Sequence, residues 1–219
     1  MFSPTLHIQT GQHLLLSPSR SIFWEEARTL ILSDLHLGKT GHFRKSGIAV
    51  PQQVYREDLQ RLVALLQWHQ PERLIVVGDM FHSFENRELD WFVKWRHDFS
   101  GLEIELVKGN HDILENDWYT RQGIRLHTPY LDLGPFRFIH DQNDQDETDD
   151  QRYTLSGHLH PGISLKGGGK QNLRFPCFYF GKKQAILPAF SAFTGTAALT
   201  PERGDKVYAI VEQTLVAIT

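Results

Sequence analysis

The sequence has 219 residues, enough for one substantial hydrophobic core, and no stretch reads as a linker, so we expect a single domain over residues 1–219. Its one cysteine, Cys177, excludes an internal disulfide and a thiolate metal site, which is typical of a reducing cytoplasm. The formal net charge of −3 argues against a protein coated in positive charge for indiscriminate nucleic-acid binding. No stretch approaches the roughly 20 apolar residues that span a bilayer, so we expect a cytoplasmic protein with no membrane partner.

Strands and helices are predicted to alternate in the first half of the chain. Short strands are expected at residues 5–8, 14–16 and 21–24. Apolar runs at residues 29–33, 73–77 and 102–107 are typical of strands buried on both faces. Apolar residues at helical spacing predict helices over residues 51–69 and 85–99, the first bounded by Pro51 and Pro71. This order indicates βαβ units and an α/β core.

The helical signal fades after about Pro129, and short strands are predicted at residues 136–139, 152–155, 175–179, 185–187 and 207–211. The sequence therefore predicts two sheets packed face to face, with helices outside. One segment, residues 141–150, is acidic and almost lacks apolar side chains. We interpret it as a solvated loop, with an auxiliary cation site as the alternative.

Side chains of metal-binding types follow five of the predicted strands. The clusters are Asp34-Leu35-His36, Gly78-Asp79, Gly109-Asn110-His111-Asp112, His140-Asp141 and Gly157-His158-Leu159-His160. Each cluster alone has a plain structural explanation, since Gly-Asp and Gly-Asn dipeptides are common in turns. Ligands of α/β folds collect beyond the carboxyl ends of strands, however, and five such endings in one chain would be an improbable coincidence. The pattern indicates one rim that carries carboxylate, imidazole and amide groups.

This series of motifs, D-x-H, G-D, G-N-H-D, H and G-H-x-H, resembles the calcineurin-like metallophosphoesterase superfamily, which carries the same blocks in the same order over almost the whole domain. The string from Ser33 to Pro51 narrows the resemblance to the bacterial DNA-ligase-associated metallophosphoesterases, which are linked to DNA repair. The resemblance implies a phosphoric ester hydrolase. It also implies a four-layer α/β/β/α sandwich of two mixed β-sheets flanked by helices.

The resemblance further implies a centre with two divalent metal ions. Carried over to this sequence, the ligands of the first ion are Asp34, His36 and His160. Those of the second ion are Asn110, His140 and His158, and Asp79 bridges the two ions. Nitrogen and oxygen ligands suit Mn, Fe, Zn, Co or Ni and disfavour Cu(I), and we expect Mn(II). Two ions about 3.5 to 4 Å apart lower the pKa of a bridging water and clamp the phosphoryl oxygens for in-line attack.

The leaving oxygen needs a proton, and His111 resembles the general acid of the superfamily. Asp112 has two interpretations: it orients His111 or stabilises its charged form, or it caps a helix after the Gly-Asn turn. One position departs from the superfamily pattern. Many members continue the fourth block as His-Gly, whereas Asp141 follows His140 here, so we expect the adjacent loop to differ.

A basic segment after the first metal block is the candidate substrate-binding loop, and its residues are Lys39, His42, Phe43, Arg44 and Lys45. We predict that its cations hold backbone phosphates while Phe43 stacks on an unpaired base. The alternative is a solvated loop whose Phe43 packs inward. Residues 166–170 are glycine-rich but lack a P-loop pattern, which favours a basic hairpin near the site.

Three functions are compatible with these motifs. The leading hypothesis is a DNA phosphodiesterase or endonuclease of DNA repair, acting on single-stranded or damaged DNA with a DNA ligase and a helicase as partners. The second is a small-molecule phosphoesterase acting on a nucleotide or a lipid-linked pyrophosphate, because fold and metals alone do not choose the substrate. The third, a non-catalytic protein-binding scaffold, is disfavoured because all seven ligands and His111 are present.

Overall fold

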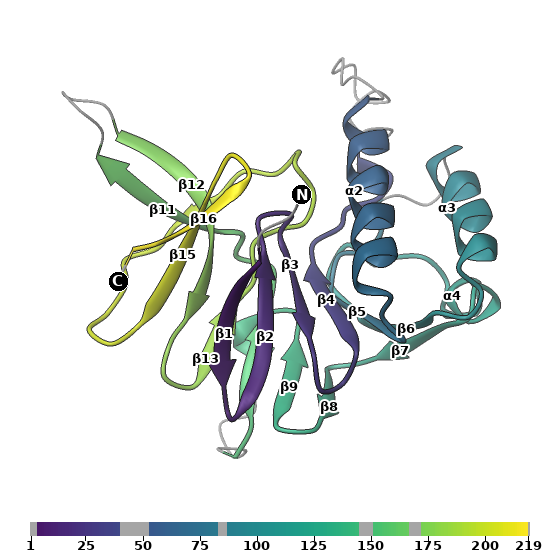
Figure 1. Cartoon of the computed structure of the whole chain (residues 1–219). Helices are drawn as coiled ribbons and strands as arrows, with labels where there is room; N and C mark the ends of the chain where they lie inside the picture. The colour runs from purple at the N-terminus through teal and green to yellow at the C-terminus, as the bar shows by residue number, and fades with distance from the viewer. Residues whose placement is uncertain (1–3, 40–52, 83–86, 145–150, 167–171, 219) are drawn as a thin grey trace.

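The computed structural model describes residues 4–39, 53–82, 87–144, 151–166 and 172–218. These residues form two β-sheets that lie face to face, with helices on one outer side (Figure 1). None of the helices in these ranges is long and apolar enough to cross a membrane.

Within the described residues, the first sheet has seven strands in chain order, and strand pairing changes from antiparallel to parallel at β4. Its antiparallel half consists of β1 (Thr5–Gln9), β2 (Gln12–Ser17), β3 (Ser21–Trp24) and β4 (Thr29–Ser33). Its parallel half continues from β4 through β5 (Arg73–Val77), β6 (Glu103–Val107) and β7 (Ile124–His127). Parallel strands need crossover connections, and helices provide those on either side of β5.

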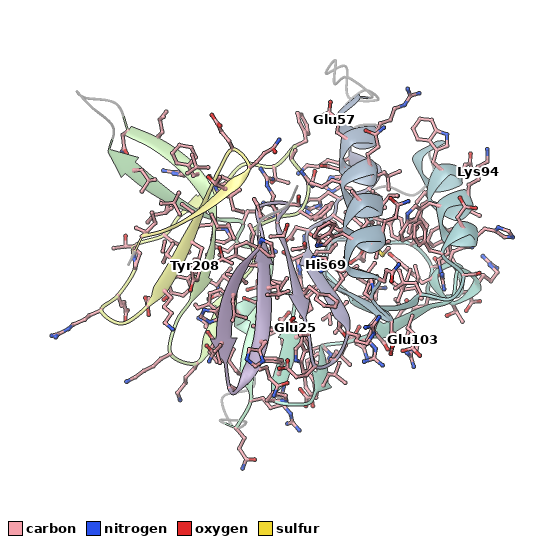
Figure 2. All side chains as sticks on the ribbon, in the orientation of Figure 1. Glu25, Glu57, His69, Lys94, Glu103 and Tyr208 are labelled. Carbon is pink, nitrogen blue, oxygen red and sulfur yellow. The ribbon has the colours of Figure 1, made fainter. Side chains whose placement is uncertain are left out.

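The helices α2 (Gln53–His69), α3 (Arg87–Asp98) and α4 (Asn116–Arg121) cover the outer face of the parallel half of the first sheet (Figure 1). Alternate residues of β4 and β5, such as Leu32 and Leu74, face this layer and contact buried helix residues including Leu62 and Phe92. Full burial of such side chains stabilises the fold by about 1.5–3 kcal/mol each. Charged side chains such as Glu57 of α2 and Lys94 of α3 are exposed to solvent (Figure 2).

The described part of the second sheet has nine strands. They are β8 (Tyr130–Leu133), β9 (Phe136–Ile139), β10 (Tyr153–Ser156), β11 (Pro161–Lys166), β12 (Asn172–Phe180), β13 (Gln184–Ile186), β14 (Ala197–Ala198), β15 (Lys206–Val211) and β16 (Thr214–Ala217). β10 lies parallel between β9 and β13, whereas β12 pairs antiparallel with β11, β13 and β15, so this sheet is also mixed. A short 3-10 helix, η1 (Gln142–Asp144), follows β9.

The inner faces of the two sheets form the central core. The first sheet contributes the residues of β4 and β5 that face away from the helices, such as Ile31 and Ile75. The second sheet contributes Phe136, Phe138 and Phe178, and all five side chains are buried. Side chains alternate between the two faces of a strand, and both faces of β4 and β5 are buried, so both sets of residues are apolar. This explains their continuous apolar runs, and it confirms the prediction of strands buried on both sides.

The predicted sandwich of two mixed sheets is confirmed, and the described α-helices all lie on the first sheet. Element bounds differ by one to a few residues from the sequence-based ones, as helix ends fray and depend on capping. The strands β7, β8, β11, β14 and β16 were not predicted, because short, partly exposed strands carry a weak apolar pattern. Within the acidic segment, residues 142–144 form η1, and residues 145–150 lie outside the described ranges.

Candidate metal centre

The carboxyl ends of five strands lie at one rim of the sandwich. Ser33 of β4 pairs with Val77 of β5, and Val77 pairs with Val107 of β6, so the loops that follow these strands leave the first sheet side by side. In the second sheet, Ser156 of β10 pairs with Ile139 of β9. The registers therefore align three of the predicted motifs at the end of the first sheet and two at the end of the second.

The rim loops have an unusual backbone. Among the described residues, ten that are not glycine have a positive φ, and five of them are predicted ligands: Asp34, His36, Asp79, His158 and His160, with φ between 49° and 63°. This left-handed region is sparsely populated by residues other than glycine, and Asp, Asn and His enter it most readily. Such conformations persist where surrounding structure determines them, and they cluster at functional sites.

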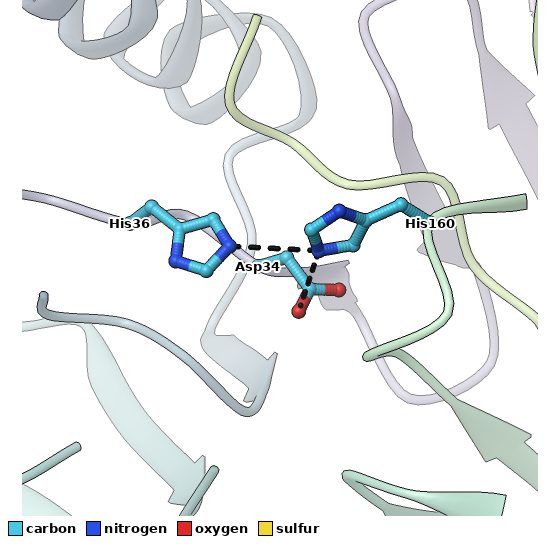
Figure 3. A group of neighbouring side chains, drawn as sticks. All are labelled: Asp34, His36 and His160. Carbon is cyan, nitrogen blue, oxygen red and sulfur yellow. Dashed lines mark hydrogen bonds and ion pairs between the residues drawn. The ribbon is translucent and has the colours of Figure 1, made fainter. Parts of the chain in front are cut away.

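The first group of side chains joins Asp34, His36 and His160 (Figure 3). Nε2 of His160 lies 3.3 Å from Oδ1 of Asp34 and 3.5 Å from Nε2 of His36. Asp34 and His36 are buried, and the side chain of His160 is 19% exposed, which leaves the group open to solvent on one side. Residues 124 positions apart therefore present their ligand atoms to a common point.

The second group joins Asp79, His140 and His158. Nε2 of His140 lies 3.1 Å from Nδ1 of His158, 3.5 Å from Oδ1 of Asp79 and 3.1 Å from Oδ1 of Asn110. Nδ1 of His140 contacts the carbonyl oxygen of Val77 at 3.4 Å. A hydrogen bond from that nitrogen to the carbonyl selects the tautomer in which Nε2 carries a lone pair, as in metal-ligating histidines.

The two groups are joined through Asp34 and His158. The backbone N–H of His158 donates to the carboxylate of Asp34, with a distance of 3.1 Å to Oδ2. The backbone of the first loop is held in turn by the second, because Asp34 N–H donates to the carbonyl of Gly78 and His36 N–H to that of Asp79. The rim loops therefore form one hydrogen-bonded unit.

Three glycines of the motifs make room for ligand side chains from other loops. A Cβ at Gly78 would collide with the ring of His140, and a Cβ at Gly109 would collide with the carboxylate of Asp79. A Cβ at Gly157 would lie 2.7 Å from Oδ2 of Asp34. In the sequence these glycines have a plain explanation as turn residues. The structure shows that they are needed because side chains of the other loops lie so close to them that no Cβ fits.

The donor set fits divalent metal ions. Two imidazole nitrogens that face each other at 3.5 Å, as in His36 and His160, repel unless a cation or a proton lies between their lone pairs. Burial lowers the pKa of His36 to about 2, with an additional contribution from the positive charge of Lys39. The His36 imidazole is therefore neutral near pH 7, so metal binding at this residue would need no loss of a proton.

The comparison with protein families agrees with this geometry. Residues 27–186 match the family model described as calcineurin-like phosphoesterase. The chain belongs to the calcineurin-like phosphoesterase family. It is therefore a metal-dependent phosphoric ester hydrolase, and the family uses divalent metals.

Solved structures include similar proteins. The crystal structure of Pseudomonas putida nuclease MPE is 30% identical, with a TM-score of 0.81, and the match covers 95% of this chain and 97% of that chain. Yfce, a phosphoesterase from E. coli, is 13% identical over 87% of this chain and 97% of that one, with a TM-score of 0.45. Comparison with curated proteins gives no match.

His111 of this phosphoesterase lies at the edge of the first group, with its ring centroid 5.7 Å from that of His36. A residue that the sequence reading missed, His82, lies against it, with ring centroids 4.2 Å apart. His82 N–H donates to the carbonyl of Leu37, which fastens this histidine beside the first loop. Its position three residues after Asp79, in the same loop, is the sequence feature that could have indicated a place near the site.

Asp112 of the phosphoesterase is 3% exposed, and both of its carboxylate oxygens accept hydrogen bonds from backbone N–H groups. Oδ2 accepts from Gly109 at 2.9 Å and Oδ1 from Phe81 at 3.0 Å. Burial raises the pKa of Asp112 to about 7, although these hydrogen bonds favour the charged form. The helix-capping interpretation is wrong, because α4 begins only at Asn116. Asp112 instead ties together the loops that carry Asp79 and Asn110.

Asp141, which follows His140 where many superfamily members have glycine, lies beside the ring of His158. An oxygen of its carboxylate lies 3.6 Å from Nε2 of His158, while Nδ1 of that ring faces His140. A carboxylate behind a ligating histidine fixes the orientation of the ring and raises its basicity. In this phosphoesterase, Asp141 thus places a carboxylate beside the ring of His158, which the sequence alone did not indicate.

Of the predicted substrate-binding residues, only Lys39 belongs to the described part of the chain. Burial lowers the pKa of its ammonium group, whereas the negative charges of Asp79 and Asp34 act in the opposite direction, so Lys39 lies within electrostatic reach of both ligand groups. His42, Phe43, Arg44 and Lys45 lie outside the described residues, as do residues 167–170 of the basic hairpin.

Proposed function

We propose that the chain is a binuclear, Mn(II)-dependent DNA phosphodiesterase that acts as an endonuclease in DNA repair. The observation that supports the proposal most strongly is the convergence of the predicted ligands in two groups linked through Asp34 and His158. In the proposal, Asp34, His36 and His160 bind one ion, Asn110, His140 and His158 bind the other, and Asp79 bridges them.

The proposed chemistry follows from this arrangement. When bound, the two ions supply positive charge for the phosphoryl oxygens and activate water near neutral pH. Asp79 contributes a carboxylate that offsets the repulsion between the ions, and its Oδ1 also accepts the backbone N–H of His111. The ring of His111 then donates a proton to the leaving oxygen as the phosphodiester bond breaks.

The choice of DNA as the substrate rests on likeness and on charge. The structurally similar protein from Pseudomonas putida is a nuclease, with 30% identity over nearly the whole length of both chains. Lys39 adds a cation beside the ligand groups, which suits a phosphate backbone. We further propose a cytoplasmic role beside a DNA ligase and a helicase, on the resemblance of the segment Ser33 to Pro51.

Substrate panels test the proposal. The purified chain, stripped of metal and reloaded with Mn(II), should hydrolyse bis(p-nitrophenyl) phosphate faster than p-nitrophenyl phosphate and should nick single-stranded circular DNA, which exposes no ends. Parallel reactions with Zn(II), Co(II), Ni(II) and Fe(II) rank the metals. Strong monoesterase activity without DNA cleavage would contradict the proposal and favour a small-molecule phosphoesterase. Inactivity with every metal would favour a binding scaffold.

A further inference from the structure

A polar cavity of about 250 Å³ lies directly beside the first ligand group. His160 forms part of its wall, and the other polar side chains in the wall are Arg20, Arg174, Thr194 and Thr196. The rest of the lining consists of Pro161, Pro176, Ala189 and Gly195. No carboxylate is found among the described residues that line it. The volume corresponds to roughly eight water molecules, which is enough for a phosphate group with part of its sugar.

Arg174 of β12 is tied to the backbone beside His160. Its Nη1 donates to the carbonyl of Thr196 at 3.2 Å, and the N–H of the next residue, Ala197, donates to the carbonyl of His160 at 2.9 Å. Gly162 permits this arrangement, because a Cβ there would lie 2.7 Å from Thr196 and 3.0 Å from Cδ of Arg174. The exposed guanidinium of Arg174 is thus held at a fixed place next to a proposed metal ligand.

Arg20 enters the cavity from the turn between β2 and β3, where its φ is 64°. Its Nη1 donates to the carbonyl oxygens of Ala189 and Ser191, at 3.2 and 2.8 Å. No described residue accepts a hydrogen bond from Nε or Nη2 of Arg20, so the N–H groups of these atoms can donate to a ligand. Burial lowers the pKa of Arg20 to about 10, with a further contribution from Arg61, so its charge is kept at neutral pH.

The segment that Arg20 holds is itself attached to the first metal loop. Phe190 N–H donates to the carbonyl of Ser33 at 2.8 Å, and Ser191 N–H donates to that of Asp34 at 3.1 Å. Both arginines are therefore connected to the ligand group through one or two backbone hydrogen bonds. Two positive charges that are fixed with respect to the ligands have little conformational entropy to lose on binding an anion.

We propose that this cavity is a second phosphate subsite, which binds the phosphate next to the scissile one in a nucleic-acid strand. Guanidinium groups match phosphate oxygens in geometry, and the threonine hydroxyls add further donors. The inference rests on the proposed function for the scissile phosphate, which lies at the two ligand groups. It deepens that function, because a site with two phosphate positions selects a polynucleotide over a nucleotide with one phosphate.

Calorimetric titration of the Mn(II)-loaded chain tests the subsite without any need for turnover. Thymidine 3′,5′-bisphosphate should bind about tenfold more tightly than the better of thymidine 3′-monophosphate and thymidine 5′-monophosphate, as expected for charged hydrogen bonds. Arg174→Ala should reduce this preference to about twofold and leave monophosphate affinity unchanged. Arg174→Lys, which keeps the charge but not the fork, should restore part of the preference.

A matched control is available at Arg203, which is exposed and lines a different cavity, away from His160. Arg203→Ala should keep the full preference for the bisphosphate. The subsite is overturned if wild-type protein shows no preference, if Arg174→Ala keeps it, or if that variant weakens both ligands equally, which would indicate an effect on the metal centre. Failure of the proposed function would give a different result. If the protein prefers the bisphosphate but does not cleave DNA, the subsite is supported and the endonuclease function is contradicted.

Discussion

The backbone N–H of His111 donates a hydrogen bond of 2.9 Å to Oδ1 of Asp79. The proposed general acid is therefore positioned by the proposed bridging ligand, although the two residues are 32 positions apart in the chain. Asp112 strengthens the same link, since it accepts N–H groups from both loops. Loss of the oxygen acceptor at residue 79 should consequently affect both metal binding and the position of His111, whereas a change of the His111 side chain keeps this backbone hydrogen bond.

Asp79→Asn separates these two roles. The amide oxygen can still accept the N–H of His111, whereas the negative charge that offsets two cations is lost. We expect diester hydrolysis to fall at least about 100-fold and the bound metal to drop by about one ion per chain. Metal analysis after gel filtration, together with circular dichroism, measures this. Asp117→Asn, at an exposed position on α4, is the matched control. Full metal content with full activity would contradict the bridging role.

His111→Ala should affect substrates according to their leaving groups. A DNA alkoxide needs a proton as it departs, so we expect DNA cleavage to fall about 100- to 10,000-fold. A p-nitrophenolate leaves readily without a proton, so hydrolysis of bis(p-nitrophenyl) phosphate should fall much less. Steady-state rates with both substrates provide the comparison, and His97→Ala on the exposed face of α3 serves as the control. Equal losses on both substrates would exclude a role as general acid.

Gly109→Ala tests the crowding at the centre. The added Cβ would lie 2.5 Å from the backbone nitrogen of Asp79 and 2.9 Å from Nε2 of His140, so these groups must shift. We expect metal affinity to fall about 10- to 100-fold and the free energy of unfolding to fall by about 1–3 kcal/mol. Gly101→Ala is the control, because no atom lies within 4 Å of its added Cβ. Metal titration and urea unfolding measure the two effects, and unchanged metal affinity would refute the crowding.

The buried histidine of the first group predicts how the stability of the metal-free protein depends on pH. Burial lowers the pKa of His36 to about 2, so below about pH 6.5 the unfolded chain binds a proton at this residue that the folded chain does not. Stability present above pH 6.5 is therefore lost on acidification, by up to about 1.4 kcal/mol per pH unit from this group alone.

Urea unfolding of chelator-treated protein at pH 7, 6 and 5 measures that slope. His36→Gln should reduce the slope by close to one proton, whereas the same change at exposed His97 serves as the control. His7 and His69 also have pKa values lowered by burial, so a residual slope of the same sign should remain in the His36 variant. An identical slope in His36→Gln and wild type would show that His36 is not responsible.

The sequence by itself determined the elements and the chemical types at the rim. Apolar runs such as residues 29–33 and 73–77 specify strands because both faces are buried, and polar residues directly after them are delivered to one edge by parallel register. The motif series then identified the family, and the ligand types indicated metals. These features are local, so they can be read along the chain.

Only the tertiary structure decided which side chains support the ligands. Asp141 faces His158, His82 lies against His111, and Arg174 lies beside His160, yet the sequence motifs assigned no role to any of the three. Their neighbours are set by how the second sheet packs on the first and by hydrogen bonds such as that between Asp34 and His158. Contacts of this kind depend on the packing of segments that are distant in the sequence. The periodic pattern of a single strand therefore cannot predict them.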